Sequence, residues 1–433
     1  MNTTDTSVET AHEMPEGDSA DNDVFVLGTN VSWAYLEERL RRALGTNAKF
    51  GSNRRIESIG VGQGFMSVMG RLYPEWMQQQ DALPRSFIVK IPSAVASHAY
   101  LKSINTDTKL DLYNERTEQE IYEDHEHLIQ QVHNTECGFY ELSESLAEKL
   151  KVPKAFVIER FVEGSSQGIL ILEDLFDAYI VPTYSNLTVD EATQVIDALS
   201  KVHAYSLCND SWLRVSKADL KDLFVANNES PERMMQILEL SADLDHERLD
   251  ERIKKLRGIF SDVFDLDFEG KLYKQMGLKP VMIHGDLWCS NVMWRGEEGS
   301  RYLAALIDWQ LVHPGCPSQD LARFITGALS GEDRRKHSEN LLERYFVKLE
   351  ENLGHKAPFT LQQIKESFFR LLPFHMFLIL LCLGPLVLHQ VQKTMPEKCD
   401  SIRVAMVDKA VTLLDDIFYY HELNSKTPRF EGH

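Results

Sequence analysis

The sequence has no excess of basic residues and no paired cysteines, and each absence excludes a class of protein. Its 46 Lys and Arg residues face 66 Asp and Glu residues, which gives a formal net charge of −20. Such a surface repels phosphate backbones, so nucleic acid is excluded as a main partner. The six cysteines lie far apart without CxxC or zinc-ligand spacing, so we expect neither a disulfide framework nor a zinc site. Scattered, unpaired thiols are typical of a reducing compartment, and the sequence therefore predicts a cytoplasmic protein.

A secretory signal and a clear membrane span are also missing from the pattern. The first residues contain no basic stretch followed by an apolar run, so no secretory signal is expected. Residues 371–388 (LLPFHMFLILLCLGPLVL) are apolar over a length near the lower limit for a span. Because this run contains two prolines, a histidine and a glycine and lacks strongly basic flanks, a buried helix is the preferred prediction. A membrane anchor is the alternative.

What the chain does contain is an ordinary globular composition. Of its 433 residues, 43% are hydrophobic and 26% charged, close to an average soluble domain, so a large core can be buried. The length suits one large two-lobed domain or two to three smaller ones. Residues 1–23 are polar and acidic, which predicts a disordered tail. Nothing in the sequence sets the oligomeric state.

The first part of the chain after this tail alternates between helical and strand patterns. Apolar residues at helical spacing follow Val31, and short strand-like runs come next, RRIES, then FMSVMGRLY and SFIVKIP. A helical stretch around YNERTEQEIYEDHEHLIQQV precedes two more strands, FVIERF and GILILEDL. This order predicts a small α+β lobe that ends near Asp174.

Beyond Thr188 the pattern is mainly helical, with one exception. The runs VMIHGDLWCSNVMW and YLAALIDWQLV both have strand character, and the turn RGEEGSR separates them. Two apolar strands joined by a short polar turn indicate a hairpin. Helical patterns then continue to about Tyr420, which predicts a helix-rich second lobe that carries this hairpin.

The hairpin region holds the strongest functional signal, Asp286 in HGDLWCSN, Asn291 five positions later and Asp308 after the next strand. Phosphoryl transfer needs a carboxylate that orients the attacking hydroxyl and takes its proton, and further oxygen ligands that hold Mg²⁺. We expect Asp286 in the first role and Asn291 with Asp308 in the second. Any one of these residues alone would be an ordinary turn or strand-end residue, but their combination favours the catalytic interpretation.

HGDLWCSNVMW together with IDWQ resembles the choline-kinase-like group of the protein-kinase-like superfamily, which also holds the aminoglycoside phosphotransferases. IGVGQGFMSVMGRLYPEW, GILILEDL and IDWQLVHPGCPSQDLARFITGALSGEDRR are similar to its ecdysteroid-kinase-like branch, and within that to a nematode family of unknown function. The resemblance runs from about Val31 to the C-terminal helices. It implies a bilobal protein-kinase-like fold with ATP and Mg²⁺ between a small sheet lobe and a large helical lobe.

A glycine-rich turn and a lysine complete the predicted nucleotide site. Gly60, Gly62 and Gly64 precede Ser67, and a turn with little side-chain bulk lets backbone N–H groups approach phosphate oxygens. The run lacks the GxxxxGK[ST] pattern, so a P-loop is not supported. Lys90 ends an apolar run one strand later, where similar kinases place the lysine that contacts the α- and β-phosphates.

The partner of Lys90 is expected to be a glutamate on the helix that follows. Three candidates occur, Glu115, Glu118 and Glu120, and the resemblance selects Glu118 because related sequences place a Glu four residues before Tyr. An acidic helical face is also a common solvated surface, so the choice among the three stays open on the residues alone.

The resemblance also implies two supporting segments. Glu173 and Leu175 would belong to the link between lobes, whose backbone groups bind adenine, although exposed acids at a strand end fit the same pattern. Asp320, in SQDLARF, and His284 would support the catalytic loop without reacting. His203 is expected to be a packed core histidine.

These features predict an ATP-dependent phosphotransferase that adds phosphate to a hydroxyl of a small molecule, such as a steroid, a glycoside or a choline-like alcohol. The predicted parts are a tail at 1–23, a nucleotide-binding lobe at 24–174, a catalytic and substrate lobe at 175–425 and a tail at 426–433. The alternative is a catalytically silent pseudokinase that keeps the fold and binds ATP or a metabolite.

Overall fold

The structure is a computed structural model of the chain, and it describes residues 24–60, 66–77, 83–95, 117–143, 150–162, 167–215, 219–226 and 230–426. The predicted N-terminal tail lies outside these ranges, as do Gly62, Gly64 and the last seven residues.

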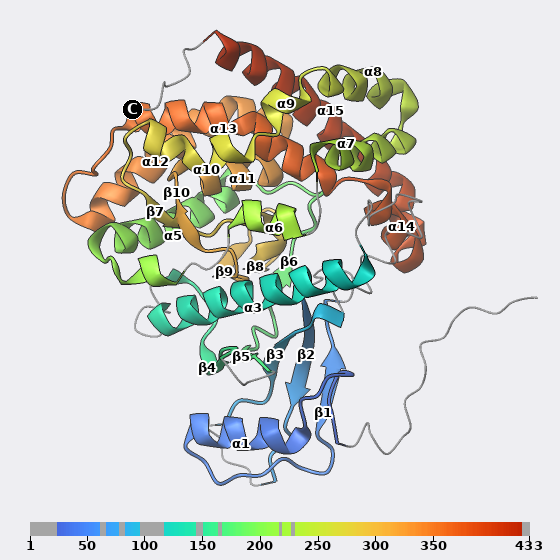
Figure 1. Ribbon diagram of the computed structural model, residues 1–433, viewed down its shortest axis with the longest axis vertical. Helices are drawn as coiled ribbons and strands as arrows, with labels where there is room; N and C mark the ends of the chain where they lie inside the picture. Colours follow the sequence, from blue (N-terminus) through green and yellow to red (C-terminus); the bar gives the residue numbers. More distant parts are fainter. Residues whose placement is uncertain are drawn as a thin grey trace, which may run out of the picture.

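A small lobe and a large, helix-rich lobe make up the molecule, and a long helix lies between them (Figure 1). The small lobe is one antiparallel sheet with strand order β1-β2-β3-β5-β4 and a helix on its outer face. Its elements are α1 (Trp33–Leu44), β1 (Arg55–Ser58), β2 (Ser67–Tyr73), β3 (Phe87–Pro92), β4 (Ala155–Glu159) and β5 (Ile169–Glu173). The predicted order of strands and helices is confirmed.

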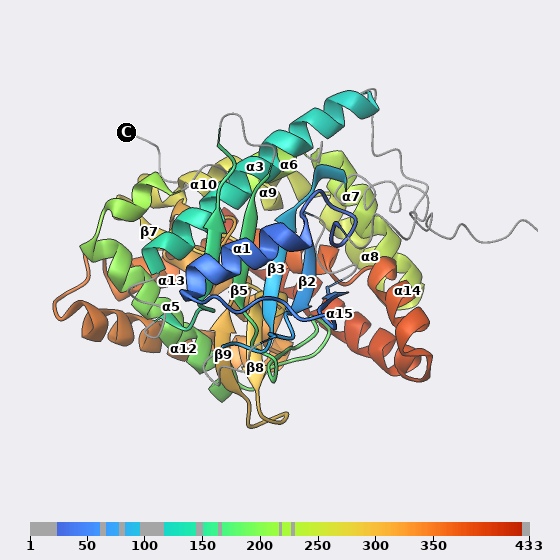
Figure 2. The same ribbon diagram turned by 90° about the horizontal axis from the view of Figure 1, so that it is seen from below.

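Helix α1 forms because its ends are capped and one face is apolar. The Ser32 hydroxyl accepts the Tyr35 N–H at the first turn, and Gly45 ends the helix in a left-handed conformation at φ 62°. Leu36 and Leu40, on the predicted apolar stripe, are fully buried against the sheet. Figure 2, seen from the small-lobe end, shows α1 lying across the strands.

The central strands β3 and β5 are buried on both faces, and their alternation places Lys90. Phe87, Val89 and Ile91 pack into the core beneath α1. Successive side chains of a strand point to opposite faces, so Lys90 faces the other way, toward the large lobe. Leu170, which pairs with Lys90 across the sheet, belongs to the large-lobe core.

Helix α3 (Glu118–Ser143) runs between the two lobes (Figure 1). The large lobe then consists of α5 (Val189–Cys208), α6 (Leu220–Ala226), α7 (Pro231–Glu239), α8 (His246–Arg257), α9 (Phe260–Val263), α10 (Leu266–Gln275), α11 (Ser318–Ala328), α12 (Gly331–Leu353), α13 (Leu361–Leu381), α14 (Pro385–Thr394) and α15 (Cys399–Ser425). One hydrophobic core joins these helices with the inner face of α3. The bilobal α+β fold expected from the sequence is therefore confirmed, while the boundary at residue 174 stays a prediction.

Short strands form two hairpin-like pairs in the large lobe. The strands are β6 (Tyr179–Ile180), β7 (Val281–Ile283), β8 (Val292–Arg295), β9 (Tyr302–Leu306) and β10 (His313–Gly315). β8 pairs with β9 as the sequence predicts, and β7 pairs with β10. The catalytic-loop candidates lie between β7 and β8, and Asp308 lies between β9 and β10.

The apolar run 371–388 is divided between two helices of the large lobe. Its first part is the buried end of α13, and α14 begins at Pro385. Pro373 lies inside α13 and cannot donate to the Phe369 carbonyl, and the Asn424 amide of α15 donates to that carbonyl at 3.1 Å instead. Within the described residues, we find no helix with the length and hydrophobicity to span a bilayer.

Candidate active site

Lys90 joins the two lobes through a pair of carboxylates. Its Nζ lies 2.6 Å from Glu136 Oε2 of α3 and 2.8 Å from Asp308 Oδ1 in the large lobe. The Lys90 and Glu136 side chains are 8% and 1% exposed, whereas Asp308 is 31% exposed. Burial would lower the pKa of Lys90, but Asp308 and Glu136 outweigh it and hold the pKa above its usual range, so Lys90 stays charged.

The partner of Lys90 on α3 is Glu136, so the sequence-based choice of Glu118 is wrong. Glu118 is the first residue of α3, and Glu136 follows it by 18 positions. At 1.5 Å per residue, these two positions are about 27 Å apart along the helix axis. One lysine cannot reach both.

The sequence does contain a signal for Glu136, which our prediction missed. Ile129, Val132 and Tyr140 form a buried stripe at helical spacing, and Glu136 falls on this stripe. A charged residue on the buried face of a helix needs a partner. Burial raises the pKa of Glu136 and Lys90 opposes that rise, as expected for a carboxylate held in place by a single buried cation.

The catalytic loop turns at Gly285, where only glycine fits. Its φ is +82°, and a Cβ there would lie 2.3 Å from the Leu311 carbonyl oxygen. The close approach of residue 311 brings the loop after β7 against the segment after Asp308. Asp286 follows this turn directly.

Two buried side chains hold the loop from beneath. The Asp320 carboxylate accepts the backbone N–H groups of His284 and Gly285 at 2.7 and 3.1 Å. His284 donates from Nε2 to the Ile307 carbonyl at 2.9 Å and accepts the Asp286 N–H at Nδ1, which fixes its neutral tautomer. Both side chains serve as supports of the loop in this geometry.

A second histidine extends this support. His203 Nδ1 lies 2.7 Å from the Tyr345 hydroxyl, and its Nε2 lies 3.6 Å from Asp320 Oδ2. Burial would raise the pKa of Asp320, but His203 and His284 outweigh it and lower the pKa below its usual value. Asp320 is therefore a carboxylate at neutral pH, and His203 is a packed core residue, as expected.

Asp286 is held between an amide and a guanidinium. The Asn291 amide donates to its Oδ2 at 3.1 Å and to its backbone carbonyl at 2.8 Å, and Arg323 Nη2 donates to its Oδ1 at 3.1 Å. Burial raises the pKa of Asp286, while Arg323 and His284 oppose the rise. Arg323 lies on α11 in the DLARF segment, and our sequence analysis did not identify it, because no spacing rule connects it to a loop 37 residues earlier.

Asn291 and Asp308 lie at the same end of the β8–β9 hairpin. Val292 pairs with Leu306, and the Ile307 N–H donates to the Asn291 carbonyl at 3.0 Å. Asp308 has a φ of +64°, a left-handed conformation that Asp and Asn tolerate better than other non-glycine residues.

The donors at this hairpin end fit a hard divalent cation. Because the Asn291 NH₂ group donates to Asp286, its amide oxygen is the atom that can face a cation, and Asp308 Oδ2 can do the same. Oxygen ligands of this type suit Mg²⁺. No cluster of three or more His, Cys, Asp or Glu side chains with metal-binding geometry occurs among the described residues. A bound Mg²⁺ would therefore need phosphate or water oxygens as its other ligands.

Only part of the predicted glycine-rich turn lies within the described residues. Gly60 follows β1 with a φ of +67°, and a Cβ there would meet open space, so its backbone conformation is what favours glycine. Ser67 begins β2 opposite Pro92, close along the sheet to the register pair Met69–Lys90. The remaining two glycines, 62 and 64, fall outside the described ranges, and the phosphate role of this turn stays a prediction.

The segment after β5 uses several of its main-chain groups internally. The Glu173 N–H donates to the Lys154 carbonyl at 2.7 Å, and the Leu175 carbonyl accepts the Ala178 N–H at 2.8 Å. Asp174, between them, accepts Ser86 at 2.6 Å and pairs with Arg71 at 2.9 Å. An adenine could use only the remaining main-chain groups here, so the role of this segment is still a prediction.

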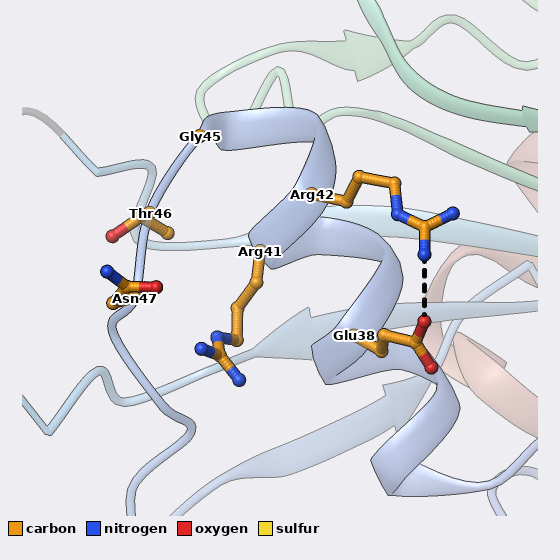
Figure 3. Close-up of a pocket in the computed structure, with 6 residues that line it drawn as sticks. All are labelled: Glu38, Arg41, Arg42, Gly45, Thr46 and Asn47. Carbon is orange, nitrogen blue, oxygen red and sulfur yellow. Dashed lines mark hydrogen bonds and ion pairs between the residues drawn. The ribbon is translucent and has the colours of Figure 1, made fainter.

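A surface hollow of about 400 Å³ lies at the C-terminal end of α1 (Figure 3). Arg41, Arg42 and Glu38 line it, and Arg42 pairs with Glu38 at 3.1 Å. Figure 1 shows α1 at the end of the small lobe opposite the large lobe, so this hollow is far from the catalytic loop. It contains none of the groups that phosphoryl transfer requires.

Comparisons with solved structures agree with a kinase-like architecture but are weak. Choline kinase from Cryptosporidium parvum has a TM-score of 0.41 at 12% identity, with 87% of this chain and 90% of that chain covered. Ethanolamine kinase from Plasmodium vivax has a TM-score of 0.37 at 13% identity, with 83% and 82% covered. At such scores, these likenesses add no argument to the topology described above.

Sequence comparisons identify curated relatives in Caenorhabditis elegans. An uncharacterized kinase-like protein is 24% identical over 297 residues, which are 66% of this chain and 71% of that protein. The uncharacterized oxidoreductase dhs-27 is 25% identical over 351 residues, or 77% of this chain. The matched region spans only 40% of the length of dhs-27. A family model matches residues 22–425, so the chain belongs to the family DUF1679, described as "Uncharacterized oxidoreductase dhs-27".

Proposed function

We propose that this protein transfers the terminal phosphoryl group of ATP to a hydroxyl of a small molecule. The observation that carries the proposal is the position of Lys90, which links Glu136 of α3 to Asp308 across the two lobes. In protein kinases a lysine on the third strand pairs with a helical glutamate, and a separate aspartate holds the metal. All three types of residue occur here in the corresponding elements.

Each residue has a distinct task in this proposal. Asp286 orients the acceptor hydroxyl and takes its proton, a contribution of about 10²–10⁴-fold in typical enzymes. Lys90, kept charged by its two carboxylates, contacts the phosphates, and Glu136 fixes its position. Asn291 and Asp308 would hold Mg²⁺, which when bound neutralises charge on the phosphate oxygens. Asp308 must then give up Lys90 as its partner, and its 31% exposure leaves room for that exchange.

The oxidoreductase name of one relative does not extend to this region in our proposal. Dinucleotide-dependent oxidoreductases typically bind their cofactor on a parallel sheet with a glycine-rich βα turn. Every strand pair in the described part of this chain is antiparallel. The matched region is 40% of that relative, so its name can refer to the remainder.

A metabolite screen tests the proposal directly. The purified protein would be incubated with γ-³²P-ATP, Mg²⁺ and a polar metabolite extract, and labelled products would be separated and identified. We expect labelled products that an Asp286→Asn variant does not form. Products that persist unchanged in this variant would contradict the assigned mechanism.

The same preparation distinguishes an enzyme from the silent alternative. An enzyme is expected to be stabilised against heat by ATP much more in the presence of Mg²⁺ than in EDTA. Strong stabilisation that ignores the metal, together with no labelled product, would favour a nucleotide-binding pseudokinase.

A further inference from the structure

Arg323 offers more hydrogen-bond donors than the chain uses. Its Nη2 donates to Asp286 Oδ1 at 3.1 Å, and the residue is 9% exposed. Its Nε and Nη1 atoms are buried and have no hydrogen-bond partner in the described part of the chain. A guanidinium carries five N–H donors in a fixed plane, so these groups point to a partner beside Asp286 that the chain itself does not supply.

His375 lies at the same level on the neighbouring helix. α11 and α13 run in parallel, because Ser318 Oγ lies 2.6 Å from Ser367 Oγ and a Cβ on Gly327 would lie 3.0 Å from Ile379. Residues 323 and 375 each precede the second contact by one helical turn. Helix packing therefore sets these two side chains side by side.

The environment of His375 is polar but unsatisfied. The residue is 3% exposed, and both ring nitrogens lack a hydrogen-bond partner among the described residues. Glu269 Oε1 of α10 lies 4.0 Å from Nε2, beyond hydrogen-bond distance, and accepts the Gln319 amide instead. Burial and the nearby Arg323 lower the pKa of His375 to about 3, with Asp320 opposing, so the ring is neutral and carries one N–H donor.

Trp288 supplies a third donor from the catalytic loop. The guanidinium carbon of Arg323 lies 6.0 Å from the centre of its indole ring. The indole Nε1–H is buried and has no partner in the described residues. Three separate elements, the loop, α11 and α13, thus bring unsatisfied donors close to the carboxylate that we assign to catalysis.

We infer that Arg323, His375 and Trp288 form the recognition site for the phosphate acceptor, and that this acceptor is an alcohol carrying a carbonyl or carboxylate oxygen near its hydroxyl. The inference rests on the proposed function and narrows its substrate class. Buried donors select a ligand that can accept their hydrogen bonds, because a ligand without acceptors would leave them unpaired. A quaternary ammonium alcohol such as choline would instead place a fixed cation against the Arg323 guanidinium.

Three small probes test the inference, 4-hydroxy-2-butanone, 3-hydroxypropanoate and choline. Their binding to the full-length protein would be measured by ligand-observed NMR, with and without Mg²⁺ and a non-hydrolysable ATP analogue. We expect both oxygen-bearing probes to bind at least about 10-fold more tightly than choline, the difference that one or two hydrogen bonds to a charged donor provide. Arg323→Met should abolish this preference.

Two further variants keep the test decisive. Trp288→Phe removes only the indole N–H and should reduce the preference about 5-fold, the effect of one hydrogen bond. Arg344→Met removes an arginine–aspartate pair of 2.6 Å on the surface of α12 and should leave the preference unchanged. Choline binding that equals or exceeds that of the other probes, a preference that survives both site variants, or no binding of any probe would overturn the inference.

Nucleotide binding is titrated separately, so the two proposals can fail independently. If the ATP analogue does not bind, the proposed phosphotransfer is wrong whatever the probes do. If the analogue binds with Mg²⁺ and choline is the preferred probe, only the acceptor class is wrong, and Glu269 becomes the candidate partner of an ammonium group.

Discussion

The two sides of Asp286 and Asp308 differ in how completely the chain satisfies its own charges. On the phosphate side (Lys90, Glu136 and Asp308), one buried cation meets two carboxylates within 2.8 Å. On the acceptor side (Arg323, His375 and Trp288), one cation meets only Asp286, and several buried donors have no partner in the described residues.

This difference shows where specificity can reside. A site whose groups already pair with one another has a geometry that does not depend on the acceptor, which suits a nucleotide common to many reactions. A site with unsatisfied donors becomes complete only with the right ligand, because buried donors left unpaired cost about 1–3 kcal/mol each. The acceptor side is therefore the region that we expect to set the substrate.

The largest expected effect comes from Asp286, which lies between the two sides. Asp286→Asn should lower kcat about 10²–10⁴-fold, since the amide cannot take the proton of the acceptor. The affinity for Mg²⁺ and the ATP analogue should change by no more than about 3-fold, because Asp286 is not a phosphate ligand in our assignment. Steady-state kinetics and calorimetric titration measure the two quantities. A large loss of nucleotide affinity would move Asp286 to the phosphate side.

The pairing of Lys90 is the next test, and it concerns the phosphate side alone. Glu136→Gln removes a charged hydrogen bond of 2.6 Å from a buried lysine, so nucleotide affinity should fall about 10-fold or more. Glu118→Gln is the matched control on the same helix and should leave affinity unchanged. Equal effects of the two substitutions, measured by calorimetry, would reject Glu136 as the residue that positions Lys90.

A buried histidine on each side makes the fold sensitive to acid. Burial, with Lys90 adding to it, lowers the pKa of His133 to about 4, and the pKa of His375 falls to about 3. The unfolded chain binds these protons near pH 6.5, so stability is full above that pH and is lost as pH falls toward 4. From pH 7 to pH 5 each histidine should reduce the free energy of unfolding by up to about 2 kcal/mol.

Urea unfolding at the two pH values measures this loss. His375→Leu should remove the acceptor-side share of the acid loss and leave the share of His133. If the difference in stability between pH 7 and pH 5 is the same in this variant, His375 is not a buried neutral group.

The smallest expected effect is a shift in the pH profile when Arg323 is removed. Arg323 opposes the rise that burial causes in the pKa of Asp286. In Arg323→Met the pKa should therefore rise further, and the acid limb of kcat/KM should move to higher pH by about one unit. A limb at the same pH would show that Arg323 does not act on Asp286.

The sequence predicts the charged residues of the phosphate side better than those of the acceptor side. Asp286, Asn291 and Asp308 could be found because they lie close together along the chain, on a loop and a hairpin. Lys90 stands out because it ends an apolar strand. Glu136 could have been found from its place on a buried stripe, but the spacing rule for a nearby tyrosine favoured another glutamate.

The acceptor side could not be predicted in the same way. Arg323 and His375 lie on two helices whose sequences show only apolar periodicity with one polar residue each. What makes them notable is the parallel packing of α11 and α13, which is a tertiary property. Their lack of partners depends on neighbours from the whole lobe, and no local pattern encodes it.

The central claim is that Asn291 and Asp308 hold a divalent cation beside a nucleotide contacted by Lys90. The most direct measurement is a calorimetric titration of the ATP analogue, with Mg²⁺ and with EDTA, for the native protein and for Asp308→Asn, which tolerates the left-handed backbone at this position. We predict that Mg²⁺ increases the affinity of the native protein at least about 10-fold, and that the variant loses this increase because it lacks a charged metal ligand. Equal affinity with and without Mg²⁺ in the native protein would contradict the account.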